Sequence, residues 1–235
     1  QLDQLQQRWP EARLYHGEAF AETAALRASE RAFGQPLAAQ VHLEQTEVLV
    51  CLEYDPLGSG PHQTVLQRGW AERRRQAAKG EGAALVFVAE SVPSLTGAAA
   101  TARLPTAPSQ LPGLLLALGQ ALGLPGAPRL NSAQQQWVQD AAAALKAHPG
   151  RGLIGISQQA SEALQAQVMQ LNQRLGHAGQ TLDWQVPRLL GYEPNQSWGS
   201  LVQLSQEAVT HLLILDCNPV LNAYLQDVLP QVPFR

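Results

Sequence analysis

Residues that could carry chemistry are sparse in this sequence. The clearest pattern is Gly150-Arg151-Gly152-Leu153-Ile154-Gly155, whose glycine spacing matches a dinucleotide-binding fingerprint. In that fingerprint the glycines follow a strand and open a helix, where backbone amides hold a pyrophosphate. Here the glycines precede and enter an apolar run that is typical of a strand, so we interpret them as a turn. The sequence has no Walker A motif, nucleophile elbow or HExxH pair.

Metal and redox chemistry find little support in the cysteines and histidines. Cys51 and Cys217 are far apart and have neither a CxxC partner nor a nearby histidine, so this chain alone cannot ligate an iron–sulfur cluster. Both lie in or beside apolar runs, and we predict buried thiols. The six histidines are also scattered: His16, His42, His62, His148, His177 and His211. None has a second type of ligand at metal spacing, so we predict surface or structural roles for them.

Two carboxylates and two tryptophans complete the candidates. Asp183 and Asp216 follow or end apolar runs, but neither has an identifiable partner that would support a general acid or base role. Trp184 and Trp198 could form a stacking surface, although aromatic residues at this frequency usually belong to the core. We predict core positions for both tryptophans.

The elements that would position these residues alternate between strands and helices. Continuous apolar runs predict strands that are buried on both faces of a parallel sheet at 48–52, 84–88 and 211–215. Shorter strands are predicted at 12–15, 102–104, 152–156 and 182–184. Helices are predicted at 2–9, 17–33, 62–78, 111–122, 133–147, between Ser157 or Ser161 and Gly176, and at 201–209.

This alternation predicts an α/β fold of Rossmann-like, three-layer units, with mainly parallel sheets and helices on both faces. The cluster Gly123-Leu124-Pro125-Gly126-Ala127-Pro128 is the densest group of residues that end regular structure. We therefore predict a first α/β unit at 1–128 and a second at 129–235.

Composition narrows the classes of partner. The chain has 235 residues, a net charge of −3 and a pI near 6.1, which favours neither nucleic acid nor an anionic membrane. Residues 73–75 and Lys79 form a basic cluster that we interpret as the solvated face of a helix. No apolar stretch is long enough to span a bilayer, and the pattern of the first residues does not predict a secretory leader in the sequence as given. We expect the chain to be a piece of a longer subunit.

Two loops place polar residues and proline directly after predicted buried strands. Asp55-Pro56 follows the strand at 48–52, and Asn218-Pro219 follows the strand at 211–215. Open α/β sheets bind ligands beyond the carboxyl ends of their strands. These two loops are therefore the predicted ligand-facing positions, and a small-molecule-binding α/β protein is one possible interpretation.

A longer succession of segments carries a family resemblance. Asp55-Pro56 is followed by residues 90–98, then by residues 104–110, and then by an apolar helix from Leu114 to Leu122. This order resembles the second domain of the molybdopterin oxidoreductase family, also called the dimethyl sulfoxide reductase superfamily. In that family a strand leads to an Asn-Pro loop, and the next strand leads to Asp-Pro-Arg-x-Thr-x-Thr-Ala. A Leu-Pro-x-Arg-Pro-Gly-Thr-Asp segment and an apolar helix follow.

The later half resembles the start of the third domain of the same family. Residues 175–179 stand where the family often has Gly-Asn-x-Gly-x-x-Gly, and residues 213–219 stand where it has a strand ending in Gly-Asn-Pro. Residues 88–98, 179–183 and 217–220 look most like the iron–sulfur subunit of alternative complex III. That subunit belongs to a bacterial quinol-oxidising respiratory complex and is often labelled hydrogenase by similarity.

The resemblance assigns family cofactor-binding positions to Asp55, Pro56, Glu90, Thr96, Cys217, Asn218 and Pro219. The sequence departs from the family pattern at several of them. Asp55 replaces the expected Asn, Val92 and Pro93 lie near the expected Asp-Pro-Arg, and residues 106–107 replace an expected Arg. An acidic residue at a phosphate-facing loop repels the ligand. We therefore expect no cofactor in this chain and regard these positions as vestigial.

The resemblance thus implies a non-catalytic structural domain of a respiratory electron-transfer complex, an oxidoreductase-family domain that is inactive on its own. Its implied partners are other subunits or domains, including an iron–sulfur domain, without nucleic acid and without direct membrane insertion. The implied location is the periplasmic face of a bacterial membrane. The alternative is a fragment of an active oxidoreductase that binds molybdopterin guanine dinucleotide.

Overall fold

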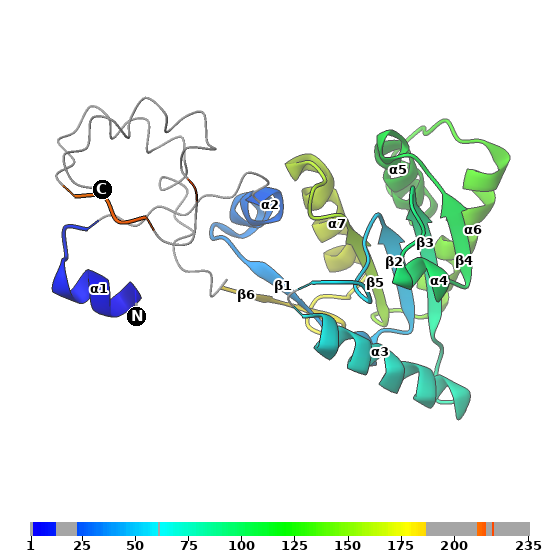
Figure 1. Cartoon of the computed structure of the whole chain (residues 1–235). Coiled ribbons are helices and arrows are strands. Elements are labelled where there is room, and N and C mark those ends of the chain that lie inside the picture. Colours follow the sequence, from blue (N-terminus) through cyan, green and yellow to red (C-terminus); the bar gives the residue numbers. More distant parts are fainter. Residues whose placement is uncertain (1, 13–22, 61, 187–210, 215–217, 219–235) are drawn as a thin grey trace. The chain divides into compact units, whose positions relative to one another are not determined.

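The structure, a computed structural model, describes residues 2–12, 23–60, 62–186, 211–214 and 218 (Figure 1). The chain divides into two compact units, one of residues 22–186 and one of residues 1–21 with 187–235. In chain order the elements are α1 (Leu2–Arg8), α2 (Thr23–Phe33), β1 (Ala38–Val41), η1 (Leu43–Gln45), β2 (Val48–Leu52), α3 (Gln63–Ala78), β3 (Leu85–Glu90), α4 (Leu95–Ala98), β4 (Ala102–Pro105), η2 (Pro108–Gln110), α5 (Leu111–Ala121), α6 (Ser132–Ala147), β5 (Gly152–Ile156), α7 (Glu162–Arg174) and β6 (Leu182–Gln185).

A four-stranded sheet forms the centre of the 22–186 unit. Its strand order is β4-β3-β2-β5, and all three pairings are parallel. All five residues of β2 are buried, as expected for a central strand whose two faces are both covered. Numbered along the chain, the order is 3-2-1-4, which matches the first four strands of a Rossmann-type sheet. The predicted α/β fold with a parallel sheet is confirmed.

Helices cover both faces of this sheet (Figure 1). One face of β2 packs Val48, Val50 and Leu52 against a core to which α5, α6 and α7 contribute. The other face packs Leu49 and Cys51 with residues of η1 and α3. This alternation follows from the period of two along a strand, which sends successive side chains to opposite layers. The three-layer arrangement predicted from the sequence is therefore present in this unit.

Side chains close both edges of the sheet. At the β5 edge the backbone N–H of Ile154 donates to Asn172 Oδ1 at 3.0 Å, and Asn172 Nδ2 donates to the carbonyl of Ile154 at 2.8 Å. At the β4 edge the indole of Trp137 donates to the carbonyl of Ala102 at 3.2 Å. An uncovered edge strand can pair with another chain. Here the side chains take hydrogen bonds that an additional strand would otherwise make.

A small antiparallel sheet lies outside this four-stranded sheet. β1 pairs with β6 over the register Ala38↔Gln185 to Val41↔Leu182, and the rings of Phe33 and Trp184 are 5.3 Å apart. The strand at β6 was predicted, whereas β1 was not. Trp184 packs against the core as a partly buried residue, which confirms its predicted core position. Trp198 lies outside the described residues.

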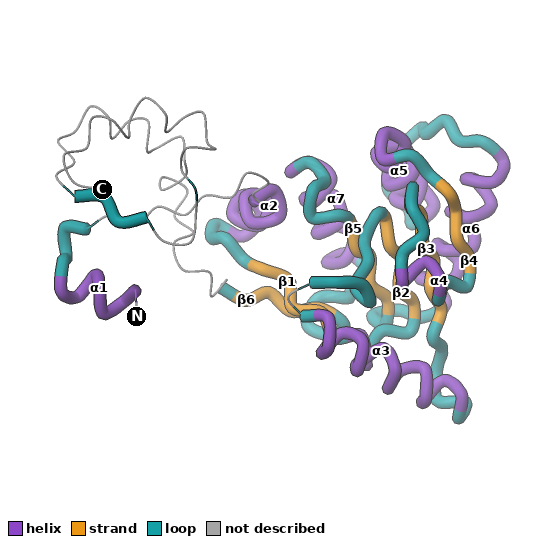
Figure 2. The backbone as a smooth tube through the Cα atoms, in the orientation of Figure 1, coloured by secondary structure: helices purple, strands orange, loops and turns teal. Residues whose placement is uncertain are grey.

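The predicted boundary near residue 128 is wrong for this unit. β5, which was predicted in the second unit, pairs with β2 along its whole length. Residues 122–131 are only a connection between α5 and α6, which contact each other (Figure 2). Clustered glycine and proline end helices inside a domain as readily as between domains. Here they mark the end of α5 and the connection to α6. The next helix begins after its N-cap Asn131, whose side chain accepts from the backbone N–H of Gln134 at 2.9 Å.

The basic segment of α3 is solvated only in part. Arg74, Arg75 and Lys79 are exposed as predicted, but Arg73 is 2% exposed and donates to the carbonyl of Glu81. The prediction of a fully solvated cluster is thus wrong for Arg73. The reason is helical periodicity, because Arg73 lies three residues after the buried Trp70 on the side of α3 that faces the sheet.

The described parts of the other unit differ from the prediction at one point. Residues 211–214 were predicted as the start of a buried strand, but only His211 takes part in an isolated bridge, and Leu213 is 71% exposed. Four apolar residues are too few for periodicity to distinguish a strand from an extended loop. The helix at α1 was predicted. The predicted elements at 13–15, 17–22, 201–209 and 215 lie outside the described residues. None of the helices that the structure describes has the length and apolar character of a membrane span.

Candidate functional site

The predicted loops after β2 and β3 lie side by side at the carboxyl end of the parallel sheet. Because β2 and β3 are parallel neighbours, both end at the same edge of the sheet, and the residues that follow β2 lie beside the residues that follow β3. Asp55, Pro56, Glu90 and Thr96 all lie at this edge, as predicted. We call these residues, together with Ser94 and Arg103, the carboxyl-edge site.

Asp55 and Thr96 join the two loops directly. Asp55 Oδ1 accepts from the backbone N–H of Thr96 at 3.0 Å and from its hydroxyl at 2.5 Å. The same hydroxyl accepts from the backbone N–H of Leu57 at 3.2 Å. Thr96 and Pro56 are buried, and Asp55 is partly exposed. The Asp55 carboxylate therefore already holds a backbone amide and a hydroxyl, the kinds of donor that a bound anion requires.

Glu90 ends β3 and is 2% exposed. Its carboxylate accepts from Arg103 Nε at 2.5 Å, from Ser94 Oγ at 2.6 Å and from Ser94 N at 3.3 Å. Gly97 lies so close that a Cβ atom there would be 1.9 Å from Glu90 Oε1. A buried carboxylate requires a cation and further hydrogen-bond donors to offset its lost hydration. Glu90 has both, and it leaves no room for a side chain at residue 97.

A third carboxylate fixes the turn that leaves β2. Glu53 has a φ of 51°, which is uncommon for a residue other than glycine, asparagine or aspartate. Its Oε1 accepts from the backbone N–H of Ser91 at 2.7 Å, and its own N–H donates to the carbonyl of Ala89 at 2.8 Å. These bonds on the β3 side hold Glu53 in its left-handed conformation. The loops after β2 and β3 are thus joined at both Glu53 and Asp55.

Tyr54 covers the point at which the strand order reverses. In an open α/β sheet this point lies between the first strand and the strand added on the opposite side, here β2 and β5. The Tyr54 ring lies directly against Gly155 of β5, because a Cβ atom there would be 2.2 Å from Tyr54 Cδ1. Burial raises the pKa of the Tyr54 hydroxyl, and the neighbouring Cys51 raises it further. The tyrosine is therefore a neutral side chain packed at the usual ligand position.

Cys51 is a buried structural thiol, as predicted. It is fully buried in the core between the sheet and α3. Burial raises the pKa of the Cys51 thiol well above its ordinary value, and the nearby charges of Asp55 and Glu90 act in the same direction. A protonated, inaccessible thiol is neither a nucleophile nor a metal ligand.

The second predicted ligand-facing loop, Asn218-Pro219, lies mostly outside the described residues. Asn218 is exposed and belongs to the unit formed by residues 1–21 and 187–235, whereas Cys217 and Pro219 lie outside the described residues. Asp216 also lies outside them. The glycine pattern at 150–155 is a turn followed by β5, as predicted, since Gly150 has a φ of 72° and the strand begins at Gly152.

Three of the histidines, His42, His148 and His177, have side-chain partners within the fold. His42 Nε2 lies 3.0 Å from Asp183 Oδ2, His148 Nδ1 lies 2.7 Å from Glu47 Oε2, and the buried His177 bonds to Asn172. No group of three or more His, Cys, Asp and Glu residues within the described ranges is arranged to hold a metal ion. His16 lies outside those ranges.

Arg103, Ser94, Glu53 and Tyr54 were not predicted as parts of the site. Arg103 gave one signal, because it is a lone charge inside the short apolar strand Ala102-Arg103-Leu104. A single charge in a strand of this kind often has a buried partner of opposite sign. Tyr54 gave no such signal, because its contact with Gly155 arises only from the pairing of β2 with β5.

The carboxyl-edge site does not fit the molybdopterin guanine dinucleotide that the family resemblance implies. The dinucleotide carries phosphates, which need free amides and cations. The amides of Ser91 and Thr96 are already bonded to Glu53 and Asp55, and Arg103 is bonded to Glu90. Three carboxylates thus hold the groups that a phosphate would need.

No protein-family model and no curated protein sequence matches this chain. What the site can do therefore has to follow from its own contacts.

Proposed function

We propose that this chain is a non-catalytic structural domain of a respiratory, quinol-oxidising electron-transfer complex. The proposal takes its family from the order of the loop segments, which resembles molybdopterin oxidoreductases. The observation that supports the absence of catalysis is the carboxyl-edge site, in which Asp55 bonds to Thr96 across the two loops and Glu90 bonds to Ser94 and Arg103. In this proposal a cofactor position of the ancestral enzyme became a set of internal contacts.

Electrostatics supports the same proposal. Within the described residues, Glu53, Asp55 and Glu90 contribute three carboxylates to the edge, and Arg103 contributes a guanidinium. Two like charges 4 Å apart repel by about 1 kcal/mol in bulk water and by more where water is excluded. A phosphate entering this edge would meet that repulsion and would also have to break existing hydrogen bonds.

The packing of Tyr54 on Gly155 bears on the interpretation as a small-molecule-binding protein. Ligands of open α/β sheets bind where the strand order reverses. Here that position is taken by a phenol ring that a side chain at residue 155 would displace. This supports a packed structural domain over a binding protein that uses the same position.

The proposed partners are the neighbouring subunits or domains of the complex, including an iron–sulfur domain, and the proposed location is the periplasmic face of a bacterial membrane. The test is metal analysis of the natural full-length subunit that contains this chain, purified with its complex from membranes. We expect iron from the iron–sulfur domain without stoichiometric molybdenum or tungsten. Molybdenum or tungsten near one atom per subunit would overturn the proposal in favour of an active pterin enzyme.

A second arm uses this chain itself, with molybdopterin guanine dinucleotide as the probe. We expect no binding to the wild-type chain and none to an Asp55→Asn variant, because Glu90 and Tyr54 are unchanged in that variant. Saturable binding by the wild-type chain would contradict the proposal even if the purified complex contains no molybdenum.

A further inference from the structure

One segment of this chain, α3 with the residue that follows it, has a net positive charge although the whole chain is negative. Residues 68–79 carry five cations, Arg68, Arg73, Arg74, Arg75 and Lys79, and one carboxylate, Glu72, for a net charge of +4. The whole chain has a net charge of −3, so the residues outside this segment carry −7, the difference between the two. This segment therefore has a charge opposite in sign to that of the remaining residues, in a chain of which only 15% is charged.

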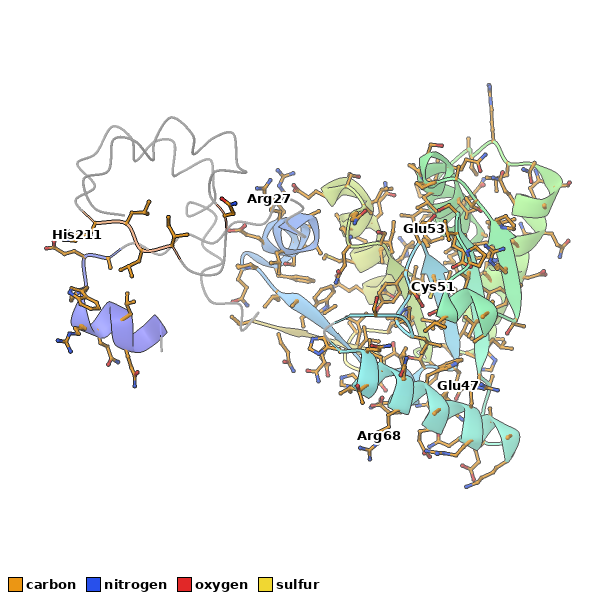
Figure 3. All side chains as sticks on the ribbon, in the orientation of Figure 1. Arg27, Glu47, Cys51, Glu53, Arg68 and His211 are labelled. Atoms are coloured by element: carbon orange, nitrogen blue, oxygen red, sulfur yellow. The ribbon has the colours of Figure 1, made fainter. Side chains whose placement is uncertain are left out.

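Three of these cations lie on one stripe of α3. Arg68, Arg75 and Lys79 are spaced by seven and four residues, which places them in line on a helix, and all three are exposed. Figure 3 shows Arg68 pointing away from the sheet. Arg74 is also exposed and flanks the stripe. We call Arg68, Arg74, Arg75 and Lys79 the α3 basic face.

The chain itself neutralises only a small part of this face. Glu72 accepts from Arg75 and also interacts with Lys79, and these contacts lower the pKa of its carboxyl. Within the described residues, neither Arg68 nor Arg74 forms a salt bridge or a hydrogen bond through its side chain. The opposite side of α3, with Gly69, Trp70 and Arg73, is buried. The helix is therefore anchored by packing, while the guanidinium groups of Arg68 and Arg74 remain available.

We propose that the α3 basic face docks the acidic surface of a partner protein. Arginine outnumbers lysine on it, and arginine is the cation enriched in protein interfaces because its planar fork binds carboxylates bidentately. Val65, which is 69% exposed, adds apolar area one turn before Arg68. The stripe from residue 68 to residue 79 spans about 16 Å of helix, enough for several carboxylates of a partner.

Two other polyanions fit the same observations less well. A helix that binds membranes needs an apolar face free to enter the lipid, whereas the apolar face of α3 is already packed on the sheet. Single-stranded nucleic acid is bound through stacking aromatics as well as cations, and the exposed residues of α3 include no aromatic side chain. The −7 charge of the remaining residues would also repel an extended polyanion, but it would repel a small acidic patch less.

The test titrates the full chain with a fluorescent helical peptide of about the length of α3, with glutamates spaced three and four residues apart. We expect saturable binding that weakens as salt is added. In the variant Arg68→Glu with Arg74→Glu, affinity should fall about tenfold or more. The control Arg27→Glu with Arg129→Glu makes the same change of net charge at exposed arginines outside α3, and it should bind like the wild type.

Two further probes separate the classes of partner: phosphatidylcholine vesicles with about a third phosphatidylserine, and a single-stranded oligonucleotide. Tighter binding of either probe than of the peptide would overturn the proposal, as would equal loss in the control variant. Thermal unfolding of each variant shows that it is folded, and Arg68→Gln with Arg74→Gln replaces any reversal variant that is not. The inference rests on charge and exposure, so it can fail independently of the metal analysis.

Discussion

The two ends of the parallel sheet hold their carboxylates in different ways. At the carboxyl end Asp55 and Glu53 accept from backbone amides, and Glu90 accepts from an amide, a hydroxyl and Arg103. At the amino end Glu47 lies between a histidine and an arginine, with Oε2 2.7 Å from His148 Nδ1 and Oε1 3.2 Å from Arg151 Nε. Figure 3 shows Glu53 and Glu47 at opposite ends of β2, with Cys51 between them.

This difference determines how each end should respond to conditions. Backbone amides carry no titratable charge, and their positions are fixed by the fold, so contacts with them change little with salt. Contacts between a carboxylate and partly exposed cations are screened by salt. The amide contacts of Glu53 and Asp55 at the carboxyl end should therefore change little with ionic strength. The contacts of Glu47 at the amino end should weaken as salt is added, and they should also depend on pH because they lower the pKa of Glu47.

The largest effect is expected from Arg103→Met at the carboxyl end. The Glu90 side chain is 3% exposed and would lose Arg103, its one cationic partner among the residues that the structure describes. Removing one member of a buried ion pair leaves an uncompensated charge, which costs about 3 kcal/mol. Because Arg103 is itself 29% exposed, the loss should fall at the low end of the usual range. Urea denaturation of the full chain measures it.

The matched variant Glu90→Gln with Arg103→Met removes both charges and keeps the shape of the site. It should recover at least half of the lost stability, because the Ser94 donors can still bond to an amide oxygen. A loss below about 1 kcal/mol for Arg103→Met alone would mean that amide and hydroxyl donors suffice for Glu90. The carboxyl end would then hold its buried carboxylates without help from a cation, unlike Glu47 at the amino end.

The next effect concerns acid stability at the amino end. His177 is fully buried beside Gly152, the first residue of β5, and its Nδ1 donates to Asn172 Oδ1 at 2.8 Å. Burial lowers the pKa of His177 to about 4, against an ordinary value of 6.5. Between about pH 4 and pH 6.5 this histidine is protonated in the unfolded chain but neutral in the folded chain. Stability should therefore fall as the pH decreases from about 6.5 to about 4, by on the order of 3 kcal/mol.

The measurement is the free energy of unfolding across that pH range for the wild type and for His177→Gln, whose side-chain amide can still donate to Asn172. The variant should lose most of this pH dependence. If its slope equals that of the wild type, another group is responsible, and His177 is not the acid-sensitive element of the amino end.

The sequence predicted the fold where one residue pattern dominated. Val48–Leu52 forms a continuous β-branched and apolar run, which only a buried strand satisfies well, and the structure has β2 over the same residues. β1 was missed because Ala38-Ala39-Gln40-Val41 contains one β-branched residue and owes its conformation to pairing with β6. The strand predicted at 211–215 was wrong at residues 212–214, because apolar character alone does not make a strand.

The candidate site was predicted in position but not in chemistry. The rule that ligands bind beyond the carboxyl ends of parallel strands led to Asp55, and the family resemblance added Glu90 and Thr96. The three residues do lie at the same edge of the sheet. What they contact could not be predicted, because Asp55 meets Thr96 across 41 positions of sequence, and Glu90 meets Arg103 across the pairing of β3 with β4. Such contacts follow from strand order, which local sequence does not encode.

The smallest effect compares the two ends of β2 directly, through Glu47→Gln and Glu53→Gln. Burial raises the pKa of Glu47, but the bonds from His148 and Arg151 outweigh it and leave that pKa below the ordinary 4.5. Glu47 therefore stabilises the fold above pH 4.5, and this contribution is lost as the pH falls through the lowered pKa of Glu47.

At neutral pH we expect Glu47→Gln to cost about 1 kcal/mol at low salt and less at high salt, because Arg151 is 45% exposed. Glu53→Gln should cost a similar amount that does not change with salt, since Ser91 N–H is its partner. Denaturation of both variants at two ionic strengths is the measurement, and equal salt dependence of the two losses would show that the ends of the sheet do not differ in the way their contacts indicate.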